Sequence, residues 1–514
     1  MLKVPLILRR YGLALLAVAG LAAAGTAHAT TCESLAKLAL PQATITTAQA
    51  VAAGDYHLPP GRPEPSGMNL AGLVQTPANP AFCRVAATLK PSADSDIHIE
   101  VWLPARWNGK FLGVGNFGWG GSMMYGGMLT GLSQGYVVAS TDTGHSDGNG
   151  KFALGHPQKI IDYAYRATHD MTVDAKRIIR ALYGKPAAQA YMIGCSLGGL
   201  ETLVEASRYP EDYDGLVVGA PPNSLVDFNA AQLWPGYLVA QNPTRMIPEA
   251  KYAVIHAAVL KACAGPVGQA QGFVDNPDTC RFDPASLECA TVDGPDCLTA
   301  PQVELMRQIY AGPADPGSGR TIFPGPARGS ELELYTFASG QPFANALDLF
   351  RYVAFQDAQW DYTSMDWSRD VATADAKIGR LFHVKPDLTP FLRRGGKILF
   401  YIGYNDYHNP AELAGYVTEV AHKAGPAYGS QVRLFTIPGM NHCAGGSGCD
   451  TFDKLGTIDA WVSRGQTLDR VIAARIDNGT VVRTRPLCAW PKVATYKGQG
   501  DMGDAANFTC RAAS

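Results

Sequence analysis

Several features that would assign a chain to a class at once are missing from this sequence. It has no block or stripe of basic residues, and 43 Lys and Arg against 45 Asp and Glu leave a formal net charge of −2. This balance argues against nucleic acid as a partner. Paired C-x-x-C units, internal repeats and low-complexity segments are lacking too, which argues against a zinc site of that type and against a repeat protein.

A long apolar segment is also missing from the body of the chain. Beyond the N-terminus there is no stretch of about 18 apolar residues, so we expect no membrane anchor in the mature protein. The 514 residues are 46% hydrophobic and 17% charged, as in a globular protein with a large core. The composition therefore predicts a soluble globular chain.

The N-terminus has the three parts of a bacterial-type signal peptide. Basic residues (Lys3, Arg9 and Arg10) precede a run of small and apolar residues, and Ala27-His28-Ala29 fits the A-x-A cleavage rule. We therefore predict a signal peptide over residues 1–29 and a secreted or periplasmic protein. Export by the general or by the twin-arginine route stays open. Either route leads to a compartment where disulfides persist.

Short β-rich runs alternate with helical patterns in two blocks, which is typical of a mostly parallel sheet covered by helices. The strand-like runs are residues 97–103, 136–140, 190–193, 397–402 and 432–437, and the helical ones are 162–183 and 411–424. Between the blocks the chain is rich in Pro, Gly and aromatic residues and carries four cysteines. We therefore predict an α/β domain formed by residues 30–220 and 389–514, interrupted by a lid over residues 221–388.

A candidate nucleophile lies in Gly194-Cys195-Ser196-Leu197-Gly198, which matches the pattern G-x-S-x-G. A strand-like run ends at Ile193 and a helix-like run begins at Gly199. This strand-turn-helix context is what a nucleophile elbow requires, and small residues allow the tight turn. The context favours Ser196 as a nucleophile over a chance Gly-Ser-Gly turn.

A serine hydroxyl is a weak nucleophile and needs a histidine base oriented by a carboxylate. In this kind of fold the acid and the histidine follow the serine in that order, in loops after later strands. Asp406 follows the run 397–402 and His442 follows the run 432–437, so both occupy the required positions. We predict these two as acid and base, with His408 and Asp450 as their nearest rivals.

Cysteines next to the predicted nucleophile and base supply an independent check. Cys195 precedes Ser196, and Cys443 follows His442. If the serine and the histidine lie within hydrogen-bond reach, their neighbours come close enough for a disulfide. We therefore predict a Cys195–Cys443 bond that fixes the two loops relative to each other.

The oxyanion formed in acyl transfer needs backbone N–H donors. One donor is expected at Leu197, the residue after the nucleophile, and the second at Gly118 or Phe117 in the glycine-rich segment 113–121. That segment also spells G-x-G-x-x-G. A dinucleotide site is disfavoured because more glycines follow in place of a helix and no acidic residue lies between Gly118 and Asp142.

Together these residues resemble the tannase and feruloyl esterase family. The resemblance rests on Cys195-Ser196 with His442-Cys443, the Asp406 loop, the Ser140 to His145 segment, and the tail around Cys488 and Tyr496. It implies an α/β-hydrolase fold with a lid and a serine carboxylic-ester hydrolase that acts on aromatic esters. It also implies further disulfides, which pair Cys32 with Cys83, Cys263 with Cys280, Cys289 with Cys297, and Cys488 with Cys510. Cys449 is then left over.

One departure from the family concerns its calcium loop in the lid, of the form Cys-Asp-x-x-Asp-Gly-x-x-Asp-Gly. Where the family has three Asp residues, this chain has Ala264, Val267 and Gln271. Calcium binds six to eight oxygens, mostly from carboxylates. We therefore expect no metal and no cofactor, and a lid that relies on Cys263–Cys280 and on packing.

The sequence says least about the substrate. We expect Arg351, Phe355 and Trp360 of the lid to contact it, although lid aromatics also build the lid's own core. Feruloyl and related hydroxycinnamoyl esters, such as those that plant cell-wall polysaccharide carries, are the first expectation. Galloyl esters, as in tannases, and terephthalate monoesters, as in mono(2-hydroxyethyl) terephthalate hydrolases, are the alternatives. A non-catalytic binding protein on a hydrolase fold is more remote, because no predicted catalytic residue is missing.

Overall fold

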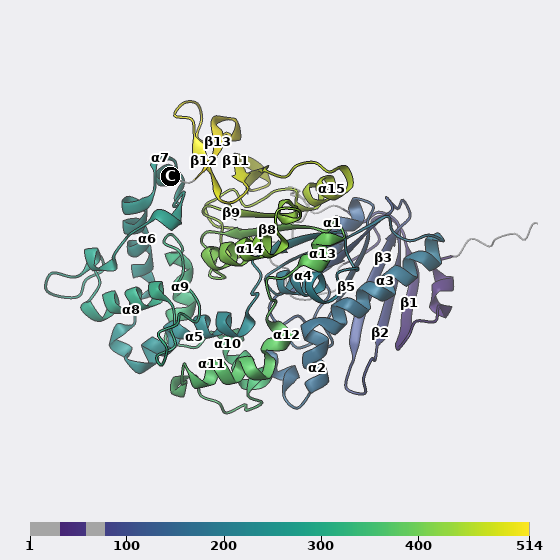
Figure 1. Ribbon diagram of the computed structural model, residues 1–514, viewed down its shortest axis with the longest axis horizontal. Coiled ribbons are helices and arrows are strands. Elements are labelled where there is room, and N and C mark those ends of the chain that lie inside the picture. Colours follow the sequence, from purple (N-terminus) through teal and green to yellow (C-terminus); the bar gives the residue numbers. More distant parts are fainter. Residues whose placement is uncertain (1–30, 58–77, 513–514) are drawn as a thin grey trace, which may run out of the picture.

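The computed structural model describes residues 31–57 and 78–512, so the signal peptide predicted over residues 1–29 lies outside the described residues. A sheet of nine strands forms the centre of the molecule, in the order β1-β2-β3-β5-β4-β6-β7-β8-β9 (Figure 1). Its strands are β1 (Ala43–Val51), β2 (Phe82–Leu89), β3 (Ile97–Pro104), β4 (Lys110–Val114), β5 (Val137–Thr141), β6 (Gln189–Cys195), β7 (Gly215–Gly219), β8 (Lys397–Gly403) and β9 (Val432–Ile437).

The strands from β5 to β9 are parallel, and β1, β2 and β3 form an antiparallel edge. The predicted run at residues 97–103 is thus a strand, but it pairs antiparallel with β5. β5 and β7 are buried along their whole length, as expected of short apolar strands that are covered on both faces. Because the parallel strands share one direction, the loops after β4, β6, β8 and β9 meet at one edge of the sheet.

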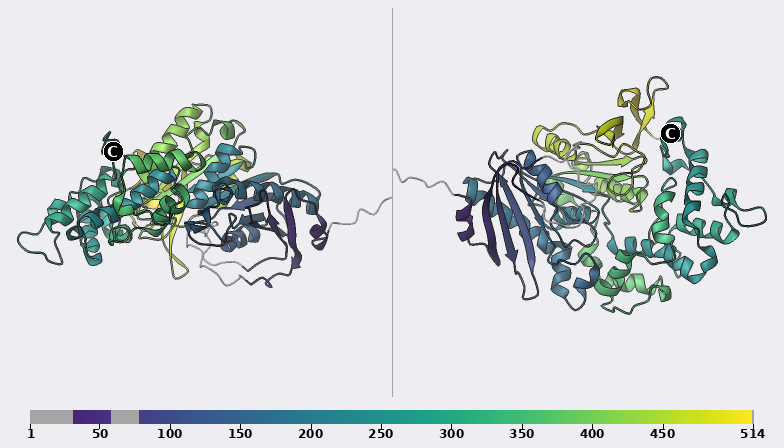
Figure 2. Two further views of the ribbon diagram at one scale, coloured as in Figure 1. Left: turned by 90° about the horizontal axis from the view of Figure 1, so that it is seen from below. Right: turned by 180° about the vertical axis from the view of Figure 1, so that it is seen from behind.

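Helices cover both faces of this sheet. On one face lie α3 (Ala167–Tyr183), α4 (Leu197–Arg208), α13 (Thr389–Arg393) and α14 (Pro410–Ala424), with α13 packed between α4 and α14 (Figure 1). On the other face, α1 (Tyr125–Ser133) packs on β5 and α15 (Lys454–Arg464) packs on β7 and β8 (Figure 2). A short α2 (Pro157–Ile161) and a π-helical turn lead into α3, so the predicted helical run at 162–183 is helical throughout.

The segment between β7 and β8 is helical, and no named strand lies in this part of the described chain. It forms a separate mass beside the sheet (Figure 1). Its helices are α5 (Leu225–Gln241), α6 (Glu249–Cys263), α7 (Pro266–Gln271), α8 (Ala300–Ala311), α9 (Glu331–Ala338), α10 (Ala344–Asp348), α11 (Arg369–Ala374) and α12 (Arg380–Phe382). Most buried apolar residues between Leu238 and Ala338 build a hydrophobic core of their own. Ile322, Phe323, and Leu349 with later residues join the core of the sheet domain.

Two small hairpins follow α15 and were not predicted from the sequence. They pair β10 (Arg470–Asp477) with β11 (Thr480–Cys488), and β12 (Lys492–Tyr496) with β13 (Phe508–Ala512). Most of their residues are only half-buried or exposed, so their sequences lack the apolar runs that mark the central strands. The hairpins lie beside α7 at the top of the molecule in Figure 1.

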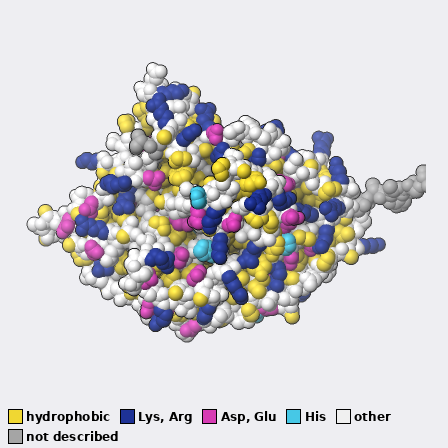
Figure 3. Space-filling model, viewed as in Figure 1, with side chains coloured by type: hydrophobic (Ala, Val, Ile, Leu, Met, Phe, Trp, Pro, Cys, Tyr) yellow, Lys and Arg dark blue, Asp and Glu magenta, His cyan; other side chains and the backbone are white. Residues whose placement is uncertain are grey.

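The surface carries charges of both signs. On the face drawn in Figure 3, Lys and Arg side chains are scattered over the lid and the sheet domain among Asp and Glu, without gathering into one stripe. Among the described residues, no helix is both long enough and apolar enough to cross a bilayer.

The structure contains five disulfides, and they join the same five pairs that the sequence analysis names. Cys195 is bonded to Cys443, and the other bonds are Cys32–Cys83, Cys263–Cys280, Cys289–Cys297 and Cys488–Cys510. Cys449 is buried and is not part of a disulfide.

Titration of the denatured, unreduced protein with a thiol reagent should therefore find one free thiol per chain. A Cys449→Ser variant is the matched control and should give none, and prior reduction should expose all eleven cysteines of the wild type. A count of three or more in the unreduced wild type would contradict this disulfide pattern.

Candidate active site

Ser196 lies at the turn between β6 and α4, where the backbone is strained. Its φ of 61° and ψ of −125° are unusual for a residue other than glycine. The turn is possible because its neighbours are small: a Cβ on Gly194 would lie 2.3 Å from the carbonyl oxygen of Gly198. The structure therefore places Ser196 on the nucleophile elbow that the sequence predicts.

Asp406 and His442 form a hydrogen-bonded pair in the loops after β8 and β9. His442 Nδ1 lies 3.0 Å from Asp406 Oδ1 and 2.9 Å from Oδ2. Burial of Asp406 would raise the pKa of its carboxyl, but the adjacent His442 and its hydrogen bond outweigh this effect and lower that pKa. The rival Asp450 instead accepts a hydrogen bond from the backbone N–H of Gly445. The carboxylate that orients His442 is thus that of Asp406.

The rival histidine, His408, also belongs to this site but has different contacts. Its backbone N–H donates to Asp406 Oδ1 at 2.8 Å, and its ring stacks on His442 with the centroids 4.1 Å apart. Burial, together with the nearby His442, lowers the pKa of His408 well below its ordinary value. His408 is therefore a neutral ring that packs against the predicted base.

The Cys195–Cys443 disulfide brings the nucleophile loop and the base loop together. The Cα atoms of the two cysteines are 6.0 Å apart, although 248 positions separate them in the sequence. His442 Nε2 lies 3.7 Å from Cys443 Sγ. The Ser196 hydroxyl makes no hydrogen bond within the described part of the chain. Nucleophile–base hydrogen bonds are often long in free enzymes.

The two predicted oxyanion donors lie at the same cavity as the nucleophile. Gly118, Ser196 and Leu197 all line it. Leu197 is the first residue of α4, so its amide has no acceptor inside the helix. In the described part of the chain, neither the Leu197 nor the Gly118 amide donates a hydrogen bond. Both N–H groups are therefore available to a substrate oxygen.

A buried carboxylate joins the glycine-rich loop to the helix of the nucleophile. Glu201 of α4 accepts a hydrogen bond from the backbone N–H of Asn116 at 2.8 Å, and the Gly198 N–H donates to the Asn116 carbonyl at 2.8 Å. The Asn116 side chain also donates to the carbonyl of Thr141 at 3.0 Å. These bonds fix the loop that carries Gly118 relative to Ser196.

The cavity is lined mainly by aromatic and amide side chains. Besides Ser196, Leu197, Gly118 and His408, its walls include Trp119, Tyr163, Phe228, Asn229, Gln232, Phe343, Asn345 and Tyr407. They come from the glycine-rich loop, from the π-helical turn before α3, from α5 and the start of α10 in the lid, and from the Asp406 loop. A planar aromatic group with polar substituents matches this lining.

The three lid residues expected to contact substrate, Arg351, Phe355 and Trp360, do not line this cavity. The rings of Phe355 and Trp360 lie 5.3 Å apart, and both pack against the buried Phe350. Arg351 Nε donates to the carbonyl of Trp360 at 2.7 Å. The expectation that these three side chains contact substrate is therefore not met, and they pack the lid against the sheet domain instead.

The residues that do line the cavity left only weak signals in the sequence. Asn229 and Gln232 are polar side chains in the otherwise apolar α5 and are buried, which is a pattern that marks a binding wall. Tyr407 directly follows Asp406. Nothing in the local sequence distinguishes Phe343 from the other lid aromatics.

Three groups of His, Cys, Asp or Glu side chains among the described residues lie close enough together to share an ion. In the first, Cys289 and Cys297 are oxidised, and the second is the group of Asp406, His408 and His442. In the third, Asp212 is already paired with His169 at 2.7 Å and with Lys176 at 3.1 Å.

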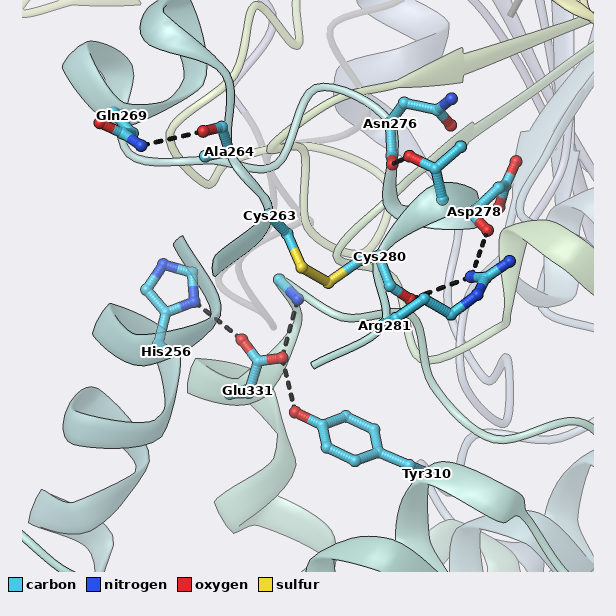
Figure 4. The surroundings of a disulfide bond; sticks show 12 residues. His256, Cys263, Ala264, Gln269, Asn276, Asp278, Cys280, Arg281, Tyr310 and Glu331 are labelled. Atoms are coloured by element: carbon cyan, nitrogen blue, oxygen red, sulfur yellow. Dashed lines mark hydrogen bonds and ion pairs between the residues drawn. A yellow bond between two sulfur atoms is a disulfide. The ribbon is translucent and has the colours of Figure 1, made fainter. Parts of the chain in front are cut away.

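The loop where the family binds calcium does not fit that ion either. Residues 266–271 form the helix α7, and Gln269 donates its side-chain N–H to the carbonyl of Ala264 (Figure 4). The nearby Asp275 accepts from the Gly268 N–H at 3.0 Å and pairs with Arg485 at 3.1 Å. Its carboxylate is thus neutralised, and too few oxygens remain for calcium.

Comparisons with known proteins identify the family of this chain. The family profile described as "Tannase and feruloyl esterase" matches residues 83–511. An uncharacterized esterase of Xanthomonas campestris pv. campestris is 33% identical over 93% of this chain and 91% of the relative. A probable feruloyl esterase B-1 of Aspergillus oryzae is 30% identical over 84% of each chain.

Solved structures agree as well. The crystal structure of feruloyl esterase B from Aspergillus oryzae superposes with a TM-score of 0.86 at 29% identity, covering 93% of this chain and 99% of the other. A tannin acyl hydrolase from Aspergillus niger reaches a TM-score of 0.74 at 20% identity over 92% of each chain, which is evidence for the fold alone. The mostly parallel sheet with flanking helices is thus an α/β-hydrolase fold, as predicted.

Burial of Glu201 generates a pH prediction for stability. Burial raises the pKa of this carboxyl from about 4.5 to about 7. The folded state therefore binds this proton more tightly than the unfolded state does. The contribution of Glu201 to the free energy of unfolding is complete below pH 4.5 and is lost as the pH rises through 7. The full effect is about 3 kcal/mol.

A Glu201→Gln variant keeps an acceptor for the Asn116 N–H but cannot ionise. Between pH 4.5 and 8 the melting temperature of the wild type should fall more steeply than that of the variant. Parallel curves across this range would contradict a buried, protonated Glu201.

Proposed function

Because this chain belongs to the tannase and feruloyl esterase family and is thus a carboxylic ester hydrolase, we propose that it cleaves aromatic esters with Ser196 as nucleophile. The proposal rests on one observation above all. The strained turn at Ser196 is tied by a disulfide to the loop of a histidine that is hydrogen-bonded to a buried aspartate.

The reaction proceeds in two displacements. His442 takes the hydroxyl proton as Ser196 Oγ attacks the ester carbonyl, and Asp406 holds the imidazole and stabilises its cation. The oxyanion is stabilised by the amides of Leu197 and Gly118. The alcohol then leaves with the proton from His442, and an acyl-enzyme remains. Water, deprotonated by His442, attacks the acyl-enzyme, releases the acid and restores Ser196.

We infer that the acyl group is a hydroxycinnamoyl or a closely related aromatic acid. Aromatic rings from three parts of the chain, among them Trp119, Phe343 and Tyr407, surround the nucleophile. The amides of Asn229, Gln232 and Asn345 lie at the same cavity and can bind phenolic oxygens. The Aspergillus oryzae relatives named as feruloyl esterases support a feruloyl group as first choice.

We also propose that the enzyme works outside the cytoplasm on esters that plant cell-wall polysaccharide can carry. The predicted signal peptide supports export, and five disulfides are typical of proteins in an oxidising compartment.

A panel of methyl ferulate, methyl gallate and a terephthalate monoester tests the acyl preference. We expect the highest kcat/KM for methyl ferulate, because the cavity offers flat aromatic walls and neutral amides in place of a free cation for a terephthalate carboxylate. A preference of tenfold or more for either of the other esters would replace the feruloyl assignment.

Replacement of the nucleophile tests the mechanism. A Ser196→Ala variant should lose several orders of magnitude in kcat on every ester of the panel, with an unchanged melting temperature. Retention of a tenth or more of the activity would remove Ser196 from its role. That result would favour the alternative of a binding protein on a hydrolase fold, whose weak esterase activity does not depend on Ser196.

We propose that the lid holds no calcium and that the enzyme needs no cofactor. The support is the donor set around α7, where the three family Asp positions are Ala264, Val267 and Gln271 and the remaining carboxylate, Asp275, is paired with Arg485. In this account the lid is held by Cys263–Cys280 and by the hydrogen bonds of Glu331 to its neighbours (Figure 4).

Treatment with a calcium chelator should therefore leave both the melting temperature and kcat of the enzyme unchanged. Addition of calcium in excess should not raise the melting temperature. A clear fall on chelation that added calcium reverses would contradict the proposal.

A further inference from the structure

A carboxylate of the lid is hydrogen-bonded to the residue that precedes the predicted base. Glu333 lies in the first turn of α9, and its Oε1 accepts a hydrogen bond from Asn441 Nδ2 at 2.6 Å. Asn441 directly precedes His442. The lid is thus in polar contact with the base loop at a distance typical of a strong hydrogen bond to a charged acceptor.

Asn441 also connects the base loop with the acid loop. Its Oδ1 accepts a hydrogen bond from Asn405 Nδ2 at 3.4 Å, and Asn405 precedes Asp406. The backbone N–H of Asn405 donates to the carbonyl of Met440 at 3.0 Å. A chain of hydrogen bonds therefore runs from α9 through Asn441 to the loop of Asp406.

Gly446 lies directly against the Asn441 side chain. A Cβ on Gly446 would lie 2.6 Å from Asn441 Oδ1, so only a glycine fits opposite this amide. The wall of the adjacent polar cavity includes Asn405, Asn441, Glu333 and Gly446. A change at Glu333 therefore removes one of the two side-chain hydrogen bonds that hold Asn441 in this wall.

The two residues of the predicted catalytic pair also act on Glu333. Burial and the negative charge of Asp406 raise the pKa of Glu333, whereas the nearby His442 lowers it. The lid carboxylate is thus close enough to interact with both residues.

Glu333 is not needed to hold α9 in the lid, because Glu331 does so. Glu331 is fully buried and accepts hydrogen bonds from His256 Nδ1 at 2.9 Å, Tyr310 Oη at 2.8 Å and the Gly329 N–H at 2.7 Å (Figure 4). Glu333 is only half-buried, and its hydrogen bond goes outside the lid.

We propose that Glu333 is a positioning residue, which holds His442 in its catalytic orientation through Asn441. The inference rests on the proposed function, since it requires His442 as the base. A base must be held to about half an ångström for efficient proton transfer, and displacement by about 1 Å costs up to a hundredfold in rate. Through this contact the placement of the lid sets the geometry of the base.

An exchange of donor and acceptor tests the proposal. Asn441→Asp places two carboxylates face to face and should lower kcat about tenfold, with KM for a small ester such as p-nitrophenyl acetate changed less than twofold. Glu333→Ala should lower kcat similarly. Glu333→Gln keeps an acceptor for Asn441 and should stay within about threefold of the wild type.

The double variant Asn441→Asp with Glu333→Gln reverses the direction of the hydrogen bond and has the net charge of the wild type. It should recover kcat to within about threefold of the wild type, a rescue that a loss of folding would not show. Leu332→Ala is the matched control, because Leu332 lies in the same helix and lines the same cavity but makes no part of the hydrogen-bond chain.

Wild-type kcat in both Asn441→Asp and Glu333→Ala would overturn the proposal, and so would a double variant no better than Asn441→Asp at equal melting temperature. His442→Ala, assayed alongside, separates the two levels of inference. If that variant is active, the proposed function fails. If it is inactive while the Glu333 variants remain fully active, only the positioning role fails.

Discussion

The covalent bond between Cys195 and Cys443 is the constraint on which the rest of the structure depends. It joins the residue before the nucleophile to the residue after the base, across 248 positions of sequence. In the chain-entropy account, closing so long a loop contributes on the order of 5 kcal/mol to stability. Its more important effect is geometric, because β6 and β9 are not neighbours in the sheet and their loops need a link to hold a common site. The lid is inserted inside this closed loop and inherits its fixed position.

Several features near the Cys195–Cys443 disulfide lower the stability of the fold. Ser196 has a strained backbone, and α4 behind it carries two buried carboxyls, Glu201 and Glu205, whose pKa values are raised by burial. The negative charge of the neighbouring Asp212 raises the pKa of Glu205 further. Buried polar groups of this kind destabilise a fold unless they serve it otherwise. Glu201 serves the fold by holding the loop of Asn116. The disulfide holds α4 and the base loop together despite the strained backbone at Ser196.

The sequence predicted the parts of the site that obey strict local rules. An elbow needs small residues around Ser196, and the acid and base must follow strands in a fixed order, so Asp406 and His442 were identifiable one by one. The disulfide next to them followed from the same adjacency. Strands β1 and β10 were not predicted because partly exposed strands lack long apolar runs. β3 was predicted as a strand, but its antiparallel pairing with β5 leaves no local signal.

The prediction of the residues that contact substrate was wrong for another physical reason. Phe355 and Trp360 have the composition of a binding pocket, but aromatic side chains fill cores and line cavities equally well, and only the three-dimensional arrangement separates the two uses. Buried amides such as Asn229 are more informative, because a polar group inside an apolar helix is costly without a purpose. The contact between Glu333 and Asn441 joins residues 108 positions apart and left no local signal at all.

The covalent ring that the Cys195–Cys443 disulfide closes affects what happens when a protease cleaves the lid. Val292, a large hydrophobic side chain that is 76% exposed, lies within this ring, in a surface loop between Cys289 and Cys297. A protease that cuts the backbone there releases no fragment. The Cys289–Cys297 and Cys195–Cys443 disulfides still join the two new chains. Nucleophile and base would stay linked after such a nick, as a two-chain enzyme that separates only under reducing conditions.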